Sequence, residues 1–247
     1  MPLARSRRSE VPVLPHVWRV SEGLAPEKTI SSGHAPLDPC LPGNGWPRGC
    51  LVEVLQERAG QHVWQLLLPA LVSRLRQSAG PVVLVNPPFE PFGPALKARG
   101  LPGERLLCVH ADRAAAQLWA TEQALRCGEV AAVLAWLPRA RSAELRRLHM
   151  AVQQHQGLLF AFRGVDACRD ASPARLRLLA GGTRSLELHI LKRRGPQLEA
   201  PVVLQAHPAR LCALLEARQR AGAPVLPLPG ASTHGRSHVL DRTAAFS

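Results

Sequence analysis

Apolar residues in the middle of the chain form short runs that alternate with longer amphipathic stretches. Seven of these runs have the length of a β-strand, at residues 51–55, 81–86, 106–110, 130–136, 157–162, 175–179 and 185–191. Unbroken runs such as VVLV (82–85) are typical of strands buried on both faces, although periodicity alone does not separate them from buried helix. The alternation predicts an α/β fold with a mainly parallel sheet flanked by helices.

Two amphipathic stretches predict helices with polar residues at their starts. Asp112 is expected to cap the first helix and Ser142 the second, because their side-chain oxygens can accept an N–H of the first turn. Residues at helical spacing follow each cap, namely Leu118, Trp119, Glu122 and Leu125 in the first and Leu145, Leu148 and Val152 in the second. Trp119 and Trp136 are both expected to lie in the core.

Residues 62–77 also have helical character, but Pro69 lies inside this stretch. Proline lacks a backbone N–H and clashes with the preceding turn of a helix. Two outcomes are open: a helix kinked near Pro69, or a helix that begins later.

The two ends of the chain differ from the middle. Residues 1–28 contain prolines and mixed charges without a sustained period and are expected to form an arm. A core domain is expected over 29–205, a short helix over 206–220 and a flexible tail over 221–247. The tail contains one apolar patch at 225–228, for which docking into a partner's groove and simple mobility are both open readings.

Composition restricts the class of protein. No apolar stretch reaches the roughly 18 residues of a membrane span, and the basic N-terminus lacks a following apolar region, so we expect a cytoplasmic protein that is neither exported nor membrane-bound. The six cysteines contain no C-x-x-C pair, so their spacing indicates neither a metal site nor a disulfide framework.

The net charge of +13 comes almost wholly from arginine, since the chain has three lysines. Residues 138–195 contain 12 Lys and Arg against 4 Asp and Glu, which is +8 of that total. We expect a DNA-binding or partner-binding surface here, formed by Arg139, Arg141, Arg146, Arg147, Lys192, Arg193 and Arg194. The alternative is a solvated surface whose arginines reflect codon bias.

One segment, residues 30–54, resembles the start of the RecA-type ATPase core. It reads ISSGHAPLDPCLPGNGWPRGCLVEV and matches that family at Ser32, Gly33, Leu37, Asp38, Gly45, Pro47, Gly49, Val52 and Glu53. The resemblance continues more loosely to about residue 204. It implies a RecA-like, P-loop-type core.

In a P-loop ATPase this strand would lead into G-x-x-x-x-G-K-[ST], which cradles phosphate and binds Mg²⁺. The chain instead reads QERAGQHV over residues 56–63, with Gly60 as its one glycine. Gln56 and Gln61 take the glycine positions, His62 the lysine position and Val63 the hydroxyl position. The loop is therefore expected to have lost Mg-ATP hydrolysis, although weak anion binding by a protonated His62 stays open.

Two further catalytic positions of the RecA-type family are also changed. The acidic residue at the end of the Walker B strand would fall at Trp136, and the catalytic glutamate near Pro88. The sequence also lacks G-x-S-x-G and S-x-x-K, so nucleophilic catalysis has no support. His34, His110 and His155 have no spaced carboxylate or histidine partners that suggest a metal. We therefore expect no catalytic residues, no metal and no cofactor.

Several motifs look like the ImuA family of bacterial RecA-like proteins. They are GWPRG (45–49), LVNPPFEPFGPAL (84–96), LWATEQALRCGEVAAVLAWLPRA (118–140), SPARLRL (172–178) and ILKRRG (190–195). This resemblance implies an accessory role in SOS-induced translesion DNA synthesis. The implied partners are an ImuB-like Y-family protein, an error-prone DNA polymerase of the alpha type and RecA, in the cytoplasm at the nucleoid.

Two other functions remain open from the sequence. The ImuA family is described as related to SulA, which implies a cell-division inhibitor under SOS control. A degenerate but working nucleotide enzyme is the third hypothesis.

Overall fold

A computed structural model describes residues 28–183 and 185–205, all of which belong to one compact unit. The arm expected over 1–28, apart from its last residue, lies outside the described residues. The helix expected over 206–220 and the tail over 221–247, with its apolar patch, also lie outside them.

The core of the fold is an eight-stranded sheet with the order β10-β9-β8-β3-β7-β6-β4-β5. Its strands are β3 (Cys50–Gln56), β4 (Val82–Val85), β5 (Leu106–Val109), β6 (Ala132–Trp136), β7 (Leu158–Gly164), β8 (Leu176–Gly181), β9 (Ser185–Lys192) and β10 (Val202–Gln205). The six strands from β8 to β5 are parallel; β9 is antiparallel to β8, and β10 is antiparallel to β9. All seven predicted strands are confirmed, whereas β10 was not predicted.

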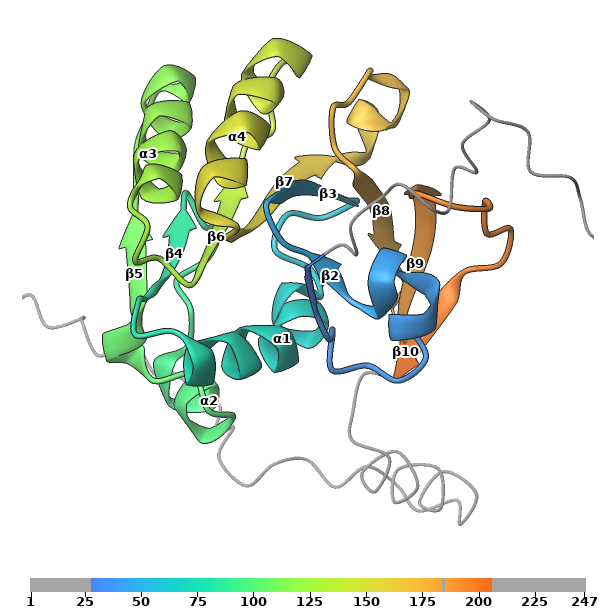
Figure 1. The fold of residues 1–247 in the computed structure, drawn as a ribbon, viewed down its shortest axis with the longest axis horizontal. Coiled ribbons are helices and arrows are strands. Elements are labelled where there is room, and N and C mark those ends of the chain that lie inside the picture. Colours follow the sequence, from blue (N-terminus) through green and yellow to red (C-terminus); the bar gives the residue numbers. More distant parts are fainter. Residues whose placement is uncertain (1–27, 184, 206–247) are drawn as a thin grey trace, which may run out of the picture. The chain divides into compact units, whose positions relative to one another are not determined.

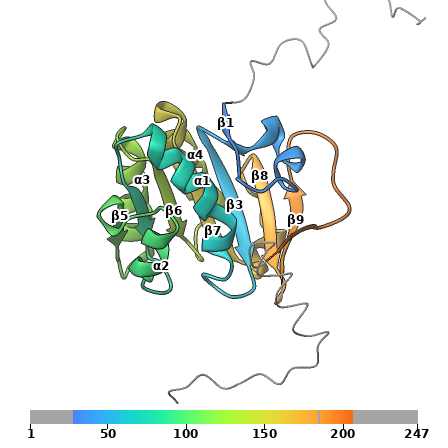
Figure 2. The same ribbon diagram turned by 90° about the horizontal axis from the view of Figure 1, so that it is seen from below.

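Helices cover both faces of the sheet (Figure 1). Helices α1 (Val63–Gln77) and α2 (Gly93–Ala98) lie on one face, as Figure 2 shows from below. Helices α3 (Ala114–Arg126) and α4 (Ser142–His155) lie side by side on the other face. This arrangement confirms the expected mainly parallel sheet flanked by helices.

Burial on both faces explains the unbroken apolar runs. Every residue of β3 is buried. Val52 and Val54 pack in the cluster that contains the buried side of α1, whereas Leu51 packs in the cluster that contains α4. Because successive side chains of a strand point to opposite faces, a strand between two helix layers has no polar face.

Shorter elements complete the described part of the chain. A small antiparallel pair, which was not predicted, joins β1 (Thr29–Ile30) to β2 (Trp46–Pro47). The 3-10 helices are η1 (Asp38–Cys40), η2 (Pro42–Asn44), η3 (Gly103–Arg105) and η4 (Val165–Arg169).

Helix α1 contains Pro69 and runs over Val63–Gln77, so the expectation of a later start is wrong. Pro69 also forms a packing surface for the segment that precedes β2. A Cβ on Gly33, whose φ is +78°, would lie 2.4 Å from the Pro69 Cβ. Gly33 therefore allows the backbone to pass close to the proline ring.

The two predicted helix caps are wrong by one residue each. Arg113, not Asp112, precedes α3, and Arg141 precedes α4, so Ser142 is the first helical residue. At α4 the side chain of Glu144 accepts the Arg141 N–H at 2.7 Å. The first turn is therefore stabilised by an acidic residue inside it rather than by a hydroxyl before it.

Candidate functional site

The loop between β3 and α1 is closed by its own side chains. Gln56 is 3% exposed, and its Oε1 accepts the Gly60 N–H at 3.2 Å while its Nε2 donates to the Gln61 carbonyl at 2.5 Å. The Gln61 N–H donates to the Arg58 carbonyl at 3.1 Å. A phosphate-binding loop needs N–H groups that point at the ligand. Here the N–H groups of Gly60 and Gln61 bond within the loop.

His62 links this loop to the turn between β8 and β9. Its Nε2 lies 2.8 Å from the carbonyl oxygen of Gly182, and its Nδ1 lies 3.0 Å from Oε1 of Gln65. Gln61 Nε2 donates to the same Gly182 carbonyl at 2.9 Å. Both ring nitrogens of His62 therefore have protein partners, and the buried Val63 begins α1 without a hydroxyl.

Gln65 extends this set of contacts to the edge of the sheet. Its Nε2 donates to the carbonyl oxygens of Gln205 at 2.9 Å and Leu204 at 3.3 Å in β10. The start of α1 is thus hydrogen-bonded to the turn between β8 and β9 and to β10. Neither contact was predicted from the sequence.

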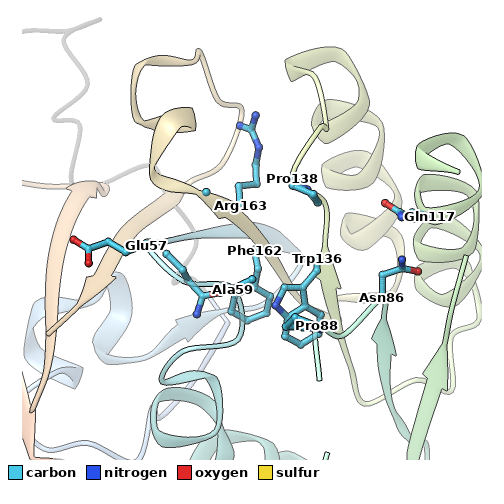
Figure 3. Close-up of a pocket in the computed structure, with 11 residues that line it drawn as sticks. Glu57, Ala59, Asn86, Pro88, Gln117, Trp136, Pro138, Phe162 and Arg163 are labelled. Atoms are coloured by element: carbon cyan, nitrogen blue, oxygen red, sulfur yellow. The ribbon is translucent and has the colours of Figure 1, made fainter. Parts of the chain in front are cut away.

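A cavity of about 350 Å³ lies where the parallel strands end. It is lined by Gln56, Glu57, Ala59, Asn86, Pro88, Gln117, Trp136, Pro138, Phe162, Arg163 and Gly164. Ligands of open parallel sheets usually bind at this edge. The structure therefore brings Gln56, Pro88 and Trp136, three positions that the resemblance singled out, to one cavity (Figure 3).

Two aromatic rings of this cavity are stacked on each other. Trp136, the last residue of β6, stacks on Phe162 of β7 with ring centroids 4.6 Å apart and an interplanar angle of 18°. Trp136 is buried, as predicted. Trp119 is 64% exposed on α3, so the expectation of a core position is wrong for that residue.

Arg163, whose side chain is almost fully buried, is the one lysine or arginine among the residues that line the cavity, and its charge is neutralised. Its guanidinium bonds to Glu53 at 3.0 Å and to Asp170 at 2.8 Å. Burial acts to lower the pKa of Arg163, but the bonds to these carboxylates raise it above its ordinary value. The cavity therefore has no unpaired cation for a phosphate among its lining residues.

Glu53 is the centre of a buried ion-pair network. Its side chain is fully buried and also accepts the Nε–H of Arg177 at 2.7 Å. Arg177 in turn donates to the carbonyl oxygens of Ala167, Cys168 and Asp170. Arg163 and Arg177 are among the 12 Lys and Arg residues counted over 138–195, but both are buried. The sequence signal that marks them is a cation within an otherwise apolar strand.

Residues 49–158 match the family described as Cell division inhibitor SulA. The chain is 33% identical to the cell division inhibitor SulA of Edwardsiella piscicida over 107 residues, which is 43% of this chain and 64% of that protein. It is 30% identical to protein ImuA of Caulobacter vibrioides over 136 residues, which is 53% of this chain and 56% of that protein.

Over these residues the chain is related to SulA and to ImuA. It matches between about half and two thirds of the length of these relatives. The region matched to the SulA family begins just before β3 and ends at the start of β7, so it contains the closed loop and helices α1 to α4. Arg163 and Arg177 lie beyond it.

The predicted basic surface is divided by the fold. Arg139, Arg141, Arg146 and Arg147 lie around the start of α4, after the carboxyl end of β6. Because β9 is antiparallel to β8, Lys192 lies opposite Arg177, near the amino end of β8. Residues 192–194 therefore leave the sheet at the amino ends of the parallel strands. The seven residues of the predicted surface therefore do not lie together, because Lys192, Arg193 and Arg194 are at the other end of the strands from the start of α4.

Three side chains of the predicted basic surface also bond to other groups of this protein. Lys192 Nζ donates to the Ser172 carbonyl at 2.9 Å, and Arg193 donates to the carbonyls of Cys40 and Pro196 at 2.8 and 2.6 Å. Arg147 bonds to Glu122 at 2.5 Å. Part of the positive charge over residues 138–195 is therefore bound in contacts within the protein.

Within the described residues, no helix has the length and apolar character needed to cross a membrane. The same part of the chain contains no group of three His, Cys, Asp or Glu side chains placed to hold a metal ion.

Proposed function

We propose that this protein is a non-catalytic accessory factor of SOS-induced translesion DNA synthesis. In this role it acts as a RecA-like adaptor with an ImuB-type Y-family protein and an error-prone DNA polymerase. The relation to ImuA supports this proposal, and the observation that carries its non-catalytic part is the closed loop. Gln56 accepts the Gly60 N–H and donates to the Gln61 carbonyl, so these groups of the loop are bonded to a side chain of the protein.

The description as a RecA-like core with degenerate Walker motifs is part of the same proposal. A buried parallel strand, β3, leads through the loop 57–62 into α1, which is the order of elements in a P-loop. Trp136 and Pro88 lie in the same cavity as Gln56. An apolar cavity whose one cation is paired suits neither Mg²⁺ nor phosphate.

Titration with a fluorescent ATP analogue and Mg²⁺ tests the non-catalytic part of the proposal. We expect no saturable binding to the wild-type protein and no hydrolysis. Tight, saturable binding that is abolished in a His62→Ala variant would contradict this expectation. A lysine-bearing P-loop ATPase tested in parallel provides the positive control.

Deletion of the gene tests the adaptor role. We expect the frequency of damage-induced mutation to fall, and the purified protein to bind the ImuB-like protein or RecA in a pull-down. Unchanged mutation frequency together with no binding to either protein would overturn the role.

The second candidate is a SulA-like inhibitor of cell division, which the match of residues 49–158 favours. Overexpression would then produce filamentous cells, while deletion would leave damage-induced mutation unchanged. The adaptor proposal predicts the reverse outcome for both measurements.

A further inference from the structure

A groove runs between the outer sides of α3 and α4, on the sheet face opposite α1. It has a volume of about 650 Å³ and is lined by Glu122, Arg126, Ser142, Ala143, Arg146, Arg147, Met150, Ala151 and Gln154. The two helices lie side by side in Figure 1, and the salt bridge from Arg147 to Glu122 joins them. The groove is separate from the cavity at the ends of the parallel strands, because the two share no lining residue.

Two large apolar side chains are exposed on these helices. Trp119 of α3 is 64% exposed and Met150 of α4 is 59% exposed. Trp119 precedes Glu122 by three residues and Arg126 by seven, so it lies on the same side of α3 as these two groove residues. Tryptophan and arginine are the residue types that most often dominate binding energy at protein interfaces.

The groove is positively charged, and its charges are held in place. Glu122, with a side chain only 9% exposed, bonds to Arg126 at 2.8 Å and to Arg147 at 2.5 Å. The side chain of Arg146 has no hydrogen bond or ion pair within the described residues. Three arginines against one glutamate leave a net charge of +2 along the groove.

We propose that this groove binds an acidic amphipathic helix of a protein partner. The apolar side of such a helix would pack on Trp119 and Met150, and its carboxylates would meet Arg146 and the two arginines fixed by Glu122. This inference rests on the proposed adaptor role and adds to it a surface and a partner chemistry.

Charge argues against this chain's own segments as occupants. Residues 1–27 contain four arginines and three glutamates, and residues 206–247 contain five arginines against one glutamate and one aspartate. Neither segment is acidic, and a second copy of the chain brings the same net charge of +13. A foreign acidic protein is the occupant that the charge favours.

The arrangement of charges also favours a protein over single-stranded DNA. A nucleic-acid backbone is bound by cations that are free to neutralise successive phosphates. Two of the three groove arginines already bond to Glu122.

Fluorescence anisotropy with defined probes tests the proposal on the full-length protein. The first probe is a labelled helical peptide of about 18 residues, with leucines on one face and glutamates on the other. The second has lysine in place of every glutamate, and the third is a labelled oligo-thymidine. We expect saturable binding of the acidic peptide and binding of the basic peptide that is at least about tenfold weaker.

Two groove variants and two controls locate the binding site. Trp119→Ala and Arg146→Glu should each weaken binding of the acidic peptide by about tenfold or more. Phe92→Ala and Arg99→Glu change an exposed aromatic and an exposed arginine outside the groove, and should leave binding unchanged. Circular dichroism of each variant checks that the fold is retained.

Unchanged binding in both groove variants would overturn the proposal, as would equal binding of the acidic and basic peptides. Binding of oligo-thymidine alone, lost in the same variants, would instead assign the groove to nucleic acid. If peptide binding is intact but gene deletion leaves mutation frequency unchanged and the protein binds neither the ImuB-like protein nor RecA, the adaptor role fails and the assignment of the groove as a peptide site is retained. If Trp119→Ala loses peptide binding yet restores mutation in the deletion strain, the groove has no part in that role.

Discussion

The side-chain carbonyl of Gln56 accepts the backbone N–H of Gly60 at 3.2 Å, and this bond closes the loop after β3 from the inside. A glutamine at this position therefore does more than replace a glycine. It supplies the acceptor that an anion would otherwise supply, so the empty loop keeps its shape without a ligand.

Replacement of Gln56 by alanine removes this internal support. Because the Gly60 N–H and the Gln61 carbonyl would lose their partner, we expect the free energy of unfolding to fall by about 1–3 kcal/mol. We expect no gain in Mg-ATP binding, since Gln61, His62 and Val63 remain. Urea unfolding measures the first effect, and Gln154→Ala, at an exposed position of α4, is the control.

The buried Glu53 should be one of the positions most sensitive to loss of charge. In Glu53→Gln the shape is kept, but Arg163 and Arg177 lose the negative charge between them. We expect a loss of about 3–5 kcal/mol in unfolding free energy, as for a broken buried ion pair. A loss below about 1 kcal/mol, similar to that of the exposed Glu57→Gln control, would show that the network does not stabilise the fold.

Stability should fall on mild acidification because of His149. Burial lowers the pKa of His149 below its ordinary value of 6.5, and the charges of Arg175 and Lys192 add to this effect. Its Nδ1 accepts the Leu51 N–H at 3.3 Å, which requires an unprotonated nitrogen. Since the unfolded chain takes up the proton first, stability is present above about pH 6.5 and declines as the pH falls toward the lower folded value.

Urea unfolding at about pH 7.5 and pH 5 checks the direction in which the free energy of unfolding changes with pH. His149→Gln keeps an acceptor but does not titrate, so its stability should change less between the two values than that of the wild type. The exposed His110→Gln should retain the wild-type dependence. An identical pH dependence in wild type and His149→Gln would refute the assignment to His149.

The turn that His62 and Gln61 contact requires glycine. Gly182 has a φ of +93°, and a Cβ there would lie 2.2 Å from the Ser185 carbonyl oxygen. Gly182→Ala should lower the unfolding free energy by about 1–3 kcal/mol from backbone strain alone. Gly181→Ala is a matched control, because no atom lies within 4 Å of its added Cβ. Equal thermal stability of the two variants would contradict the prediction.

Much of the secondary structure could be predicted, because burial leaves a local pattern. The strand around Leu84 is apolar throughout since both of its faces are covered. Helix starts were less accurate, because a capping residue differs little from its neighbours in sequence. The loop from Gln56 to Val63 could also be interpreted locally, since its chemistry depends on residue types at fixed spacing.

The sequence by itself determined the α/β class, seven of the eight strands of the main sheet and the changed residues of the loop. Only the tertiary structure decided that Glu53 joins Arg163 to Arg177, and that β9 carries Lys192 to the opposite end of the strands from Arg139. It also decided that Trp119 lies outside the core. The physical reason is that local patterns report which face of an element is buried. Contacts between residues 100 or more positions apart depend instead on strand order and direction, which no local pattern carries.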